Sequence, residues 1–246
     1  MKATFICCYN NTKELNEMLL PSFKKLGRND SNLILIDTVK EKYKSAAEAY
    51  NKTIEKRKSE IGEILIFLHQ DIAFNNSDFL DSIIFELKEN PNQILGFAGI
   101  NDSGTVLSNL KYRKEESFIT RNQIKEKIKV CSLDECCFAM SSSVYDKLKF
   151  DEAVCNHWHL YAVELCYRAK KESIQSYVLP NIIFHKESNN GGLYSDKHFL
   201  TSMWRLAMKY KKDFECIYAP CYICKTNRLQ AAVKLLKTSI KNLIHK

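Results

Sequence analysis

The amino-acid sequence predicts an α/β fold in which helices flank a mostly parallel β-sheet. Three apolar segments of strand length, residues 3–8, 33–37 and 64–68, alternate along the chain with two segments of helical periodicity, 15–26 and 45–58. Strands that alternate with helices are typical of parallel sheets covered on both faces. A further segment with helical spacing, residues 229–243, predicts a C-terminal helical tail.

The segments carry different signals. Apolar residues recur at helical spacing from Leu15 to Leu26, and the segment 45–58 places Ala46, Ala49, Tyr50 and Ile54 on one helical face. The five residues 64–68 are all apolar, which suits a strand that is buried on both faces. The segments 3–8 and 33–37 are the other two strands.

Polar side chains follow each predicted strand at the point where it ends. They are Tyr9 and Asn10 after the first strand, Asp37 at the end of the second, and His69, Gln70 and Asp71 after the third. In a parallel arrangement these ends lie along one edge of the sheet, where ligands bind in open α/β sheets. An aspartate there can hold a divalent cation, which can hold a diphosphate. The alternative is that His69 and Asp71 merely begin a surface loop.

Eight segments together resemble the GT-A-fold (Rossmann-like) glycosyltransferases of family 2, and especially their "HQD" subgroup from bacterial surface-polysaccharide loci. In order, the matching segments are 8–11, Asp37, Ala47–Asn51, His69–Asp71, 131–140, Phe150–Glu152, Trp158–Cys166 and Phe184–His185. The resemblance covers roughly residues 3–190. Two departures stand out: His69 replaces the first aspartate of the usual Asp-x-Asp triplet, and Tyr161–Ala162 stands where many relatives have Glu-Asp.

The resemblance implies a nucleotide-sugar donor and a Mn²⁺ or Mg²⁺ ion. The donor-binding residues would be Tyr9, Asn10, Asp37, Asn51, His69 and Gln70. The metal ligands would be Asp71 and His185, and His69 would be a third ligand or a hydrogen-bonding partner of a phosphate. Such an ion acts as a Lewis acid on the departing diphosphate, where negative charge develops.

Inverting transfer also needs a base that takes the proton from the acceptor hydroxyl, and a carboxylate is the usual choice. Three carboxylates in acceptor-like segments are candidates: Asp134, Glu135 and Glu164. A solvated helix residue is the alternative interpretation of Glu164. Trp158 and His159 are candidate acceptor-binding residues that would stack on a sugar ring, with partial core packing as the alternative for Trp158.

Length and composition indicate a globular protein. The chain has 246 residues, of which 45% are hydrophobic and 27% charged. No apolar stretch reaches the roughly 18 residues that span a bilayer, and no secretion signal is expected. Ten cysteines, several in apolar strands, suggest reduced thiols in a cytoplasmic protein. The lone pair Cys221 and Cys224 is expected to be structural, and residues 189–192 to form a loop or a lid.

Positive charge is concentrated at the C-terminus. From residue 209 onward nine basic residues face only two acidic ones, so this part carries +7 of the net charge of +8. Within it an apolar stripe opposes a lysine face; the stripe consists of Leu229, Val233, Leu236, Ile240 and Leu243. Such a helix lies on an anionic membrane surface or packs on protein. We therefore divide the chain into a GT-A domain, 1–212, and a basic amphipathic tail, 213–246.

The sequence as a whole predicts an inverting, metal-dependent glycosyltransferase of the hexosyltransferase type, acting in surface polysaccharide or lipooligosaccharide biosynthesis. Its acceptor would be a saccharide or lipid-linked. Two alternatives remain: a non-catalytic relative that binds nucleotide sugars, and a membrane-associated scaffold. The expected location is cytoplasmic, including the inner face of the cytoplasmic membrane. Binding to nucleic acid is not expected, because the basic residues are confined to the tail and no binding motif is present.

Overall fold

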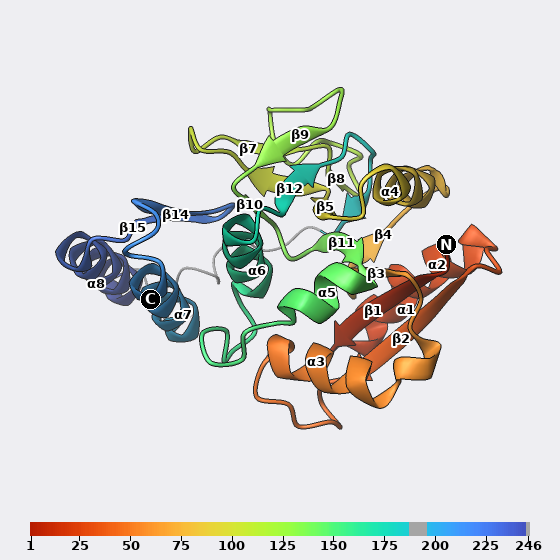
Figure 1. The fold of residues 1–246 in the computed structure, drawn as a ribbon, viewed down its shortest axis with the longest axis horizontal. Helices are drawn as coiled ribbons and strands as arrows, with labels where there is room; N and C mark the ends of the chain where they lie inside the picture. Colours follow the sequence, from red (N-terminus) through yellow and green to blue (C-terminus); the bar gives the residue numbers. More distant parts are fainter. Residues whose placement is uncertain (187–195, 245–246) are drawn as a thin grey trace.

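The computed structural model describes residues 1–186 and 196–244 and confirms the predicted α/β fold (Figure 1). Its central sheet has seven strands, of which β9 and β11 run antiparallel to their neighbours. Across the sheet the order is β2 (Ser31–Asp37), β1 (Ala3–Tyr9), β3 (Ile64–His69), β11 (Cys137–Ser141), β5 (Gln93–Gly96), β12 (Gln175–Val178) and β9 (Ile128–Val130). The loop or lid expected at 189–192 lies outside the described residues.

Helices cover both faces of this sheet, as the alternation of strands and helices predicts. One face packs against α3 (Ala46–Lys56), α5 (Ser142–Leu148) and α6 (Tyr161–Lys171). The other packs against α1 (Thr12–Glu17), α2 (Leu19–Leu26) and α4 (Asp78–Glu89), and a short 3-10 turn, Lys58–Glu60, precedes β3. Strand β3 lies between the two cores, and its residues Ile64–Leu68 are fully buried.

The single helix expected over 15–26 is divided at Met18 into α1 and α2. Pro21 explains the break, because a proline cannot donate to the carbonyl four residues earlier and its ring clashes with that carbonyl. The carbonyl concerned belongs to Glu17, the last residue of α1. The first helix therefore ends there, and α2 begins at Leu19.

Two small sheets extend the central one. The first consists of β4 (Ile72–Ala73), β13 (Phe184–His185) and β8 (Lys111–Tyr112). The second consists of β10 (Ser132–Leu133), β6 (Ala98–Ile100) and β7 (Val106–Ser108). Both lie at the edge where β3 ends, so they bring later parts of the chain to the strand ends that the sequence singled out.

The C-terminal part forms a third packed unit beside α6 (Figure 1). It consists of α7 (Lys197–Lys209), the hairpin β14 (Cys216–Ala219) and β15 (Tyr222–Lys225), and α8 (Arg228–Ile244). One core joins α6, α7, the hairpin and α8, so packing is continuous across the boundary expected at residue 212, which stays a prediction. Among the described residues, no helix is both long and apolar enough to cross a membrane.

None of the ten cysteines, all of which lie in the described residues, forms a disulfide, and seven of them are buried. Cys221 and Cys224 flank the start of β15, and burial raises the pKa of the Cys221 thiol to about 12. A thiol with such a pKa is protonated at neutral pH and is a poor metal ligand. The arrangement favours the structural role expected for this pair.

Candidate functional site

Three candidate residues from distant segments meet at the end of β3. His69 is the last residue of β3, and Asp71 lies two residues further along the chain. His185 reaches the same place because β13 pairs antiparallel with β4, with His185 opposite Ile72. One ligand atom from each of His69, Asp71 and His185 lies within 4.8 Å of the other two. Within the described chain, this is the only group of three or more histidine, cysteine or acidic side chains so close together.

The hydrogen bonds of His185 fix which of its nitrogens faces the site. Nδ1 lies 2.6 Å from the backbone carbonyl oxygen of Lys186, which can only accept, so Nδ1 carries the proton and donates. Nε2, the nitrogen left for a ligand, faces the Asp71 carboxylate, 3.6 Å from Oδ2. An imidazole whose far nitrogen donates to a carbonyl is the usual arrangement of a metal-bound histidine.

The three side chains fit a divalent cation. Oδ1 of Asp71 is buried and has no hydrogen-bond partner in the structure, although a buried carboxylate oxygen normally has one. Burial lowers the pKa of His69 from 6.5, so this imidazole is neutral at pH 7 and can bind metal. A cation among these atoms would satisfy the orphan oxygen of Asp71 and bind one imidazole nitrogen each from His69 and His185.

Lys186 and Glu14 are further polar groups at this site that were not anticipated from the sequence. Nζ of Lys186 lies 2.6 Å from Oε1 of Glu14, and the Asp71 carboxylate contributes to the raised pKa of this lysine after the larger effects of Glu14 and Glu17. Lys186 is 44% exposed and directly follows His185. Its position next to the Phe184–His185 motif was the one feature of the sequence that could have identified it. The Lys186 side chain supplies a positive charge that can contact an anionic ligand.

The ends of β1 and β2 form a second polar pair. Tyr9 and Asp37 are register partners, and the Tyr9 hydroxyl donates to Oδ2 of Asp37 over 3.0 Å. Oδ1 of Asp37 accepts from the backbone N–H groups of Val39 and Lys40, which together lower the pKa of this carboxyl group. Asp37 is therefore ionised and held in place, with 18% of its side chain exposed.

Gln70 shapes the loop between β1 and α1. Its Oε1 accepts from the backbone N–H groups of Asn10 and Asn11, each over 2.9 Å. Its Nε2 donates to Oδ1 of Asn10 and to Oε2 of Glu14. The amide is thus fully used within the protein, so Gln70 and Asn10 lie at the predicted edge but bind mainly each other.

Asp134 and Glu135 lie just beyond β10 on the other side of His69. Oδ1 of Asp134 accepts from the backbone N–H of Cys136, and the carboxylate is close enough to raise the pKa of His69 against the effect of burial. Burial raises the pKa of Glu135 well above 4.5, and the N–H groups at the start of α6 limit this increase. Oε1 of Glu135 has no hydrogen-bond partner in the structure. Tyr161, the first residue of α6, places its hydroxyl 3.4 Å from Nε2 of His69. This contact connects the start of α6, beside Glu135, with the residues at the end of β3.

Glu164 occupies a different environment from the other two carboxylates. It is fully buried, 2.8 Å from the Arg168 guanidinium and 2.6 Å from Nζ of Lys209. Oε1 also accepts from the Tyr210 hydroxyl. The alternative interpretation, that Glu164 is a solvated helix residue, is wrong, because its side chain belongs to an ion-pair cluster in the interior. With both oxygens paired to cations, Glu164 has no free oxygen to offer an acceptor hydroxyl.

Asn51 lies away from the strand ends, between α3 and the segment after α5. Its amide nitrogen donates to the carbonyl of Phe150 and to Glu152, and its oxygen accepts from Phe150 N–H and the Tyr145 hydroxyl. The Ala47–Asn51 and Phe150–Glu152 motifs are thus hydrogen-bonded to each other. This gives Asn51 a packing role in the structure.

Trp158 and His159 precede α6 on the acceptor-like side. Trp158 is 38% exposed, and Nε2 of His159 lies 3.0 Å from Oδ2 of Asp196. The neighbouring His157 contacts His198 through ring nitrogens 3.1 Å apart. The half-exposed Trp158 ring therefore lies on a loop that the contacts of His157 and His159 fix to the segment 196–198.

Several solved structures share this fold. GalNAc-T7, in complex with UDP, GalNAc and Mn²⁺, has a TM-score of 0.63 and 12% identity, over 87% of this chain and 48% of that one. The mannosyltransferase PcManGT from Pyrobaculum calidifontis, in complex with GDP-Man and Mn²⁺, has a TM-score of 0.56 and 11% identity, over 99% and 74%. S. aureus TarS 1–349 has a TM-score of 0.50 and 13% identity, over 98% and 72%. The chain therefore spans less than half of GalNAc-T7.

At these identities the structural likeness shows the GT-A fold alone. No curated protein sequence matches the chain. The sequence of residues 4–183, however, matches a protein family over the whole span from β1 to the residue before β13. This stretch contains the strand ends, the triplet at His69 and the acceptor-side carboxylates. On that match, the chain belongs to the Glycosyltransferase like family.

Proposed function

We propose that the protein is an inverting, metal-dependent glycosyltransferase of the HQD subgroup, which moves a sugar from a nucleotide-diphosphate sugar to a saccharide or lipid-linked acceptor in surface-polysaccharide biosynthesis. The observation that carries this proposal is the group of His69, Asp71 and His185 at the end of β3, with its orphan carboxylate oxygen. Such a site at a strand end of a GT-A fold is suited to a diphosphate ligand.

Asp71, His185 and His69 would hold the cation. Two imidazoles favour a transition ion such as Mn²⁺ over Mg²⁺, which prefers oxygen ligands. Once bound, the ion would neutralise the negative charge of the departing diphosphate. Lys186 supports the same task, because its ammonium group lies beside Asp71 and can bind a phosphate oxygen once it leaves Glu14.

Tyr9 and Asp37 would receive the nucleoside. The ionised Asp37 accepts hydrogen bonds from N–H or O–H donors, which bases and riboses carry, and Tyr9 offers an aromatic ring beside it. Gln70 would act indirectly by holding the Asn10–Asn11 backbone in the shape that borders this space.

Glu135 is the best candidate for the base among the three carboxylates. Its pKa is raised by burial, which brings a carboxylate closer to the basicity that proton abstraction at neutral pH requires. One of its oxygens is buried and lacks a partner, whereas Glu164 is paired with two cations. The choice of Glu135 over Asp134 rests on the raised pKa of Glu135. Trp158 would offer a stacking surface to the acceptor sugar.

A thermal-shift screen tests the proposal directly. Panels of UDP and GDP sugars are added with and without Mn²⁺ to the wild-type protein and to Asp71→Asn. We expect one donor to raise the melting temperature only with Mn²⁺, and Asp71→Asn to lose that increase. Asp102→Asn is the matched control, because Asp102 is an exposed carboxylate outside the site.

Release of nucleoside diphosphate in the same samples separates an enzyme from a non-catalytic binding protein. Turnover of the stabilising donor in the presence of acceptor would support the proposal. Mn²⁺-dependent binding without any diphosphate release would leave the non-catalytic alternative, and donor binding that is independent of both Mn²⁺ and Asp71 would contradict the metal site.

A further inference from the structure

The inner face of α8 is fixed by its packing. Ala231 and Leu235 are buried in the core shared with α7 and the β14–β15 hairpin, and the Thr238 hydroxyl lies 2.8 Å from the Tyr222 hydroxyl. Residues three and four apart share one face of a helix, so 231, 235 and 238 define the face turned toward the protein. The opposite face is turned outward.

That outward face is apolar. Leu229 is 74% exposed, Leu236 62%, Ile240 46% and Val233 44%. At 3.6 residues per turn these four side chains fall within roughly 60° of arc, directly opposite the buried face. They are four of the nine large apolar side chains exposed in the described chain, so their concentration on one helix sets α8 apart from the rest of the surface. The side chain of Leu243, expected in the same stripe, lies outside the described ones.

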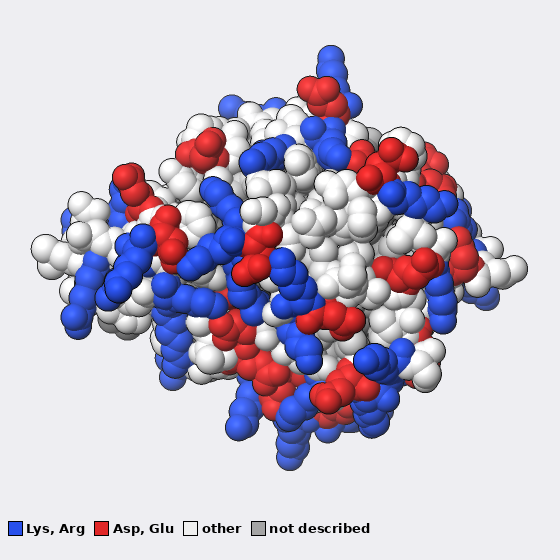
Figure 2. Space-filling model, viewed as in Figure 1, with Lys and Arg blue, Asp and Glu red and all other residues white. Residues whose placement is uncertain are grey.

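Basic side chains flank the stripe on one side. A groove of about 570 Å³ runs along α8 between the apolar residues Leu229 and Val233 and the lysines Lys234, Lys237 and Lys241. Residues 228–244 include no acidic residue. Figure 2 shows basic side chains over this end of the molecule, with uncharged surface between them.

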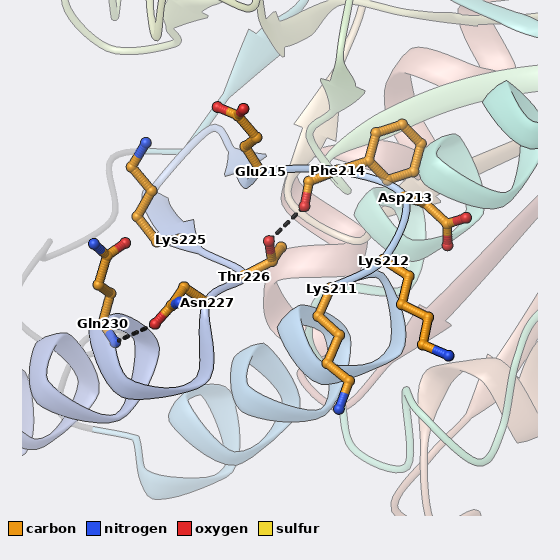
Figure 3. A pocket seen from close by; sticks show the side chains of 9 residues that line it. All are labelled: Lys211, Lys212, Asp213, Phe214, Glu215, Lys225, Thr226, Asn227 and Gln230. Atoms are coloured by element: carbon orange, nitrogen blue, oxygen red, sulfur yellow. Dashed lines mark hydrogen bonds between the residues drawn. The ribbon is translucent and has the colours of Figure 1, made fainter.

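A second hollow of about 390 Å³ continues this surface at the start of α8, and Gln230 borders both. Figure 3 shows Lys211 and Lys212 extending from the end of α7 and Lys225 from the end of β15 around this hollow. Asp213 and Glu215 also line it, but Asp213 is paired with Lys171 at 2.9 Å. The basic surface is therefore longer than α8 itself.

We propose that the outward face of α8, with Lys234, Lys237 and Lys241, docks on an anionic membrane surface. The apolar stripe needs an apolar partner, and the row of lysines beside it needs negative charge. A bilayer offers both, with an apolar interior beneath anionic headgroups. Antiparallel pairing of two copies through the stripe would place their lysine rows side by side, which opposes that form of self-association.

The docking face is joined to the acceptor side of the site. The β14–β15 hairpin leads directly into α8, and the Ser132 hydroxyl donates to the Tyr218 carbonyl at its inner end. Cys221, at the hairpin turn, lies near the Asp134 and Glu135 carboxylates. This part of the inference rests on the proposed function: a membrane under α8 would bring lipid-linked acceptors to Glu135.

The test measures binding of the full chain to sedimenting vesicles of pure phosphatidylcholine and of phosphatidylcholine with phosphatidylglycerol, at low and high salt. We expect binding only to the anionic vesicles and a steep loss as salt rises. Lys237→Glu should weaken binding at least about 10-fold, because each lysine near the surface contributes about 5-fold and the reversal counts twice. Leu236→Ser should also weaken it.

Two variants on another helix are matched controls. Phe85→Ser removes an apolar side chain of α4 with 63% exposure, and Lys88→Glu reverses an exposed charge on the same helix. Both should bind vesicles like the wild type. Equal binding to neutral vesicles, no binding at low salt, or equal losses in the α4 variants would overturn the proposal. A dimer in light scattering that Leu236→Ser dissociates would show instead that the face binds a second copy.

Failure of this inference and failure of the proposed function are distinguishable. Leu236→Ser should keep the Mn²⁺-dependent stabilisation by donor, because its side chain points away from the site. Asp71→Asn should keep vesicle binding while losing that stabilisation.

Discussion

Nε2 of His185 faces Oδ2 of Asp71 across 3.6 Å, and its orientation is set by the hydrogen bond from Nδ1 to a backbone carbonyl. The distance is too long for a hydrogen bond and leaves room for a third atom between the two groups. Nε2 of His185 and Oδ2 of Asp71 thus face one volume without a hydrogen bond between them. A proton or a metal ion can resolve this, and the two compete.

The first prediction is that removing His185 and removing Asp71 lower the affinity for Mn²⁺ to different extents. His185→Ala should lower the affinity for Mn²⁺ by about 10-fold, because water can replace one neutral ligand, whereas Asp71→Asn should lower it by about 100-fold or more, because it removes the only charge. Titration calorimetry with Mn²⁺ alone measures both values. The affinity of the wild type should fall at acidic pH, below the lowered pKa of His69, where a proton competes with the metal for this imidazole. Equal losses in the two variants would contradict the assigned roles.

The second prediction concerns Glu135. Glu135→Gln should cut transfer to acceptor by about 100-fold while the dissociation constant of the donor stays unchanged, as expected for a lost general base. Initial rates and donor titrations measure the two quantities. If transfer remains at the wild-type rate, the base lies elsewhere, and the same assay on Asp134→Asn then decides on its neighbour.

The raised pKa of Glu135 also predicts a stability effect with a definite sign. Between pH 4.5 and its higher folded-state value, the folded protein keeps a proton that the unfolded chain releases, so the free energy of unfolding falls as pH rises through this window. Glu135→Gln, which does not titrate, should remove this loss. Its unfolding midpoint in urea at neutral pH should therefore equal or exceed that of the wild type, and a lower midpoint would show that the ionised group stabilises the fold.

The third prediction separates Glu164 from catalysis. Glu164→Gln leaves Arg168 and Lys209 without their buried partner and should cost about 3 kcal/mol of unfolding free energy. Transfer per folded molecule should change little. Glu172→Gln is the control, because Glu172 forms an exposed pair with Lys147 and its loss should cost under about 0.5 kcal/mol. A stable Glu164→Gln protein with abolished transfer would make Glu164 the base after all.

The fourth prediction concerns the nucleoside. Asp37→Ala should raise the dissociation constant of the donor by about 10-fold and lower the maximal rate less, because the carboxylate touches a part of the substrate that does not react. Binding of inorganic pyrophosphate with Mn²⁺ is the internal control and should stay unchanged. A variant that binds the donor normally but turns over slowly would argue against this placement.

The sequence predicted the fold well because the sheet is built from long apolar runs. Strands β1, β2 and β3 lie where expected, and the helix after β2 differs from its predicted bounds by one or two residues at each end. The break at Met18 was missed, although Pro21 was a visible cause. Pairing of the short strands β4 and β13 could not be predicted, because two residues carry no periodicity.

The site was predicted less well, because residue type does not report on neighbours. Glu164 and Glu135 are both glutamates near polar segments. Only the three-dimensional structure shows that the first is enclosed by cations and the second has an unpartnered oxygen. Asn51 is similar: its motif is visible in the sequence, but its partners at Phe150 are about a hundred residues away in the chain.

The connection between β15 and α8 is short and held by hydrogen bonds. Thr226 and Asn227 separate the two elements; the Thr226 N–H donates to the Glu215 carbonyl, and the Asn227 side chain accepts from the first N–H groups of the helix. A membrane bound by α8 would therefore lie at a fixed distance from the carboxylates of Asp134 and Glu135. If the protein transfers sugar at a membrane as proposed, this fixed distance selects acceptors by length: a lipid-linked acceptor whose hydroxyl lies at that distance from the membrane would react, and shorter or longer ones would not.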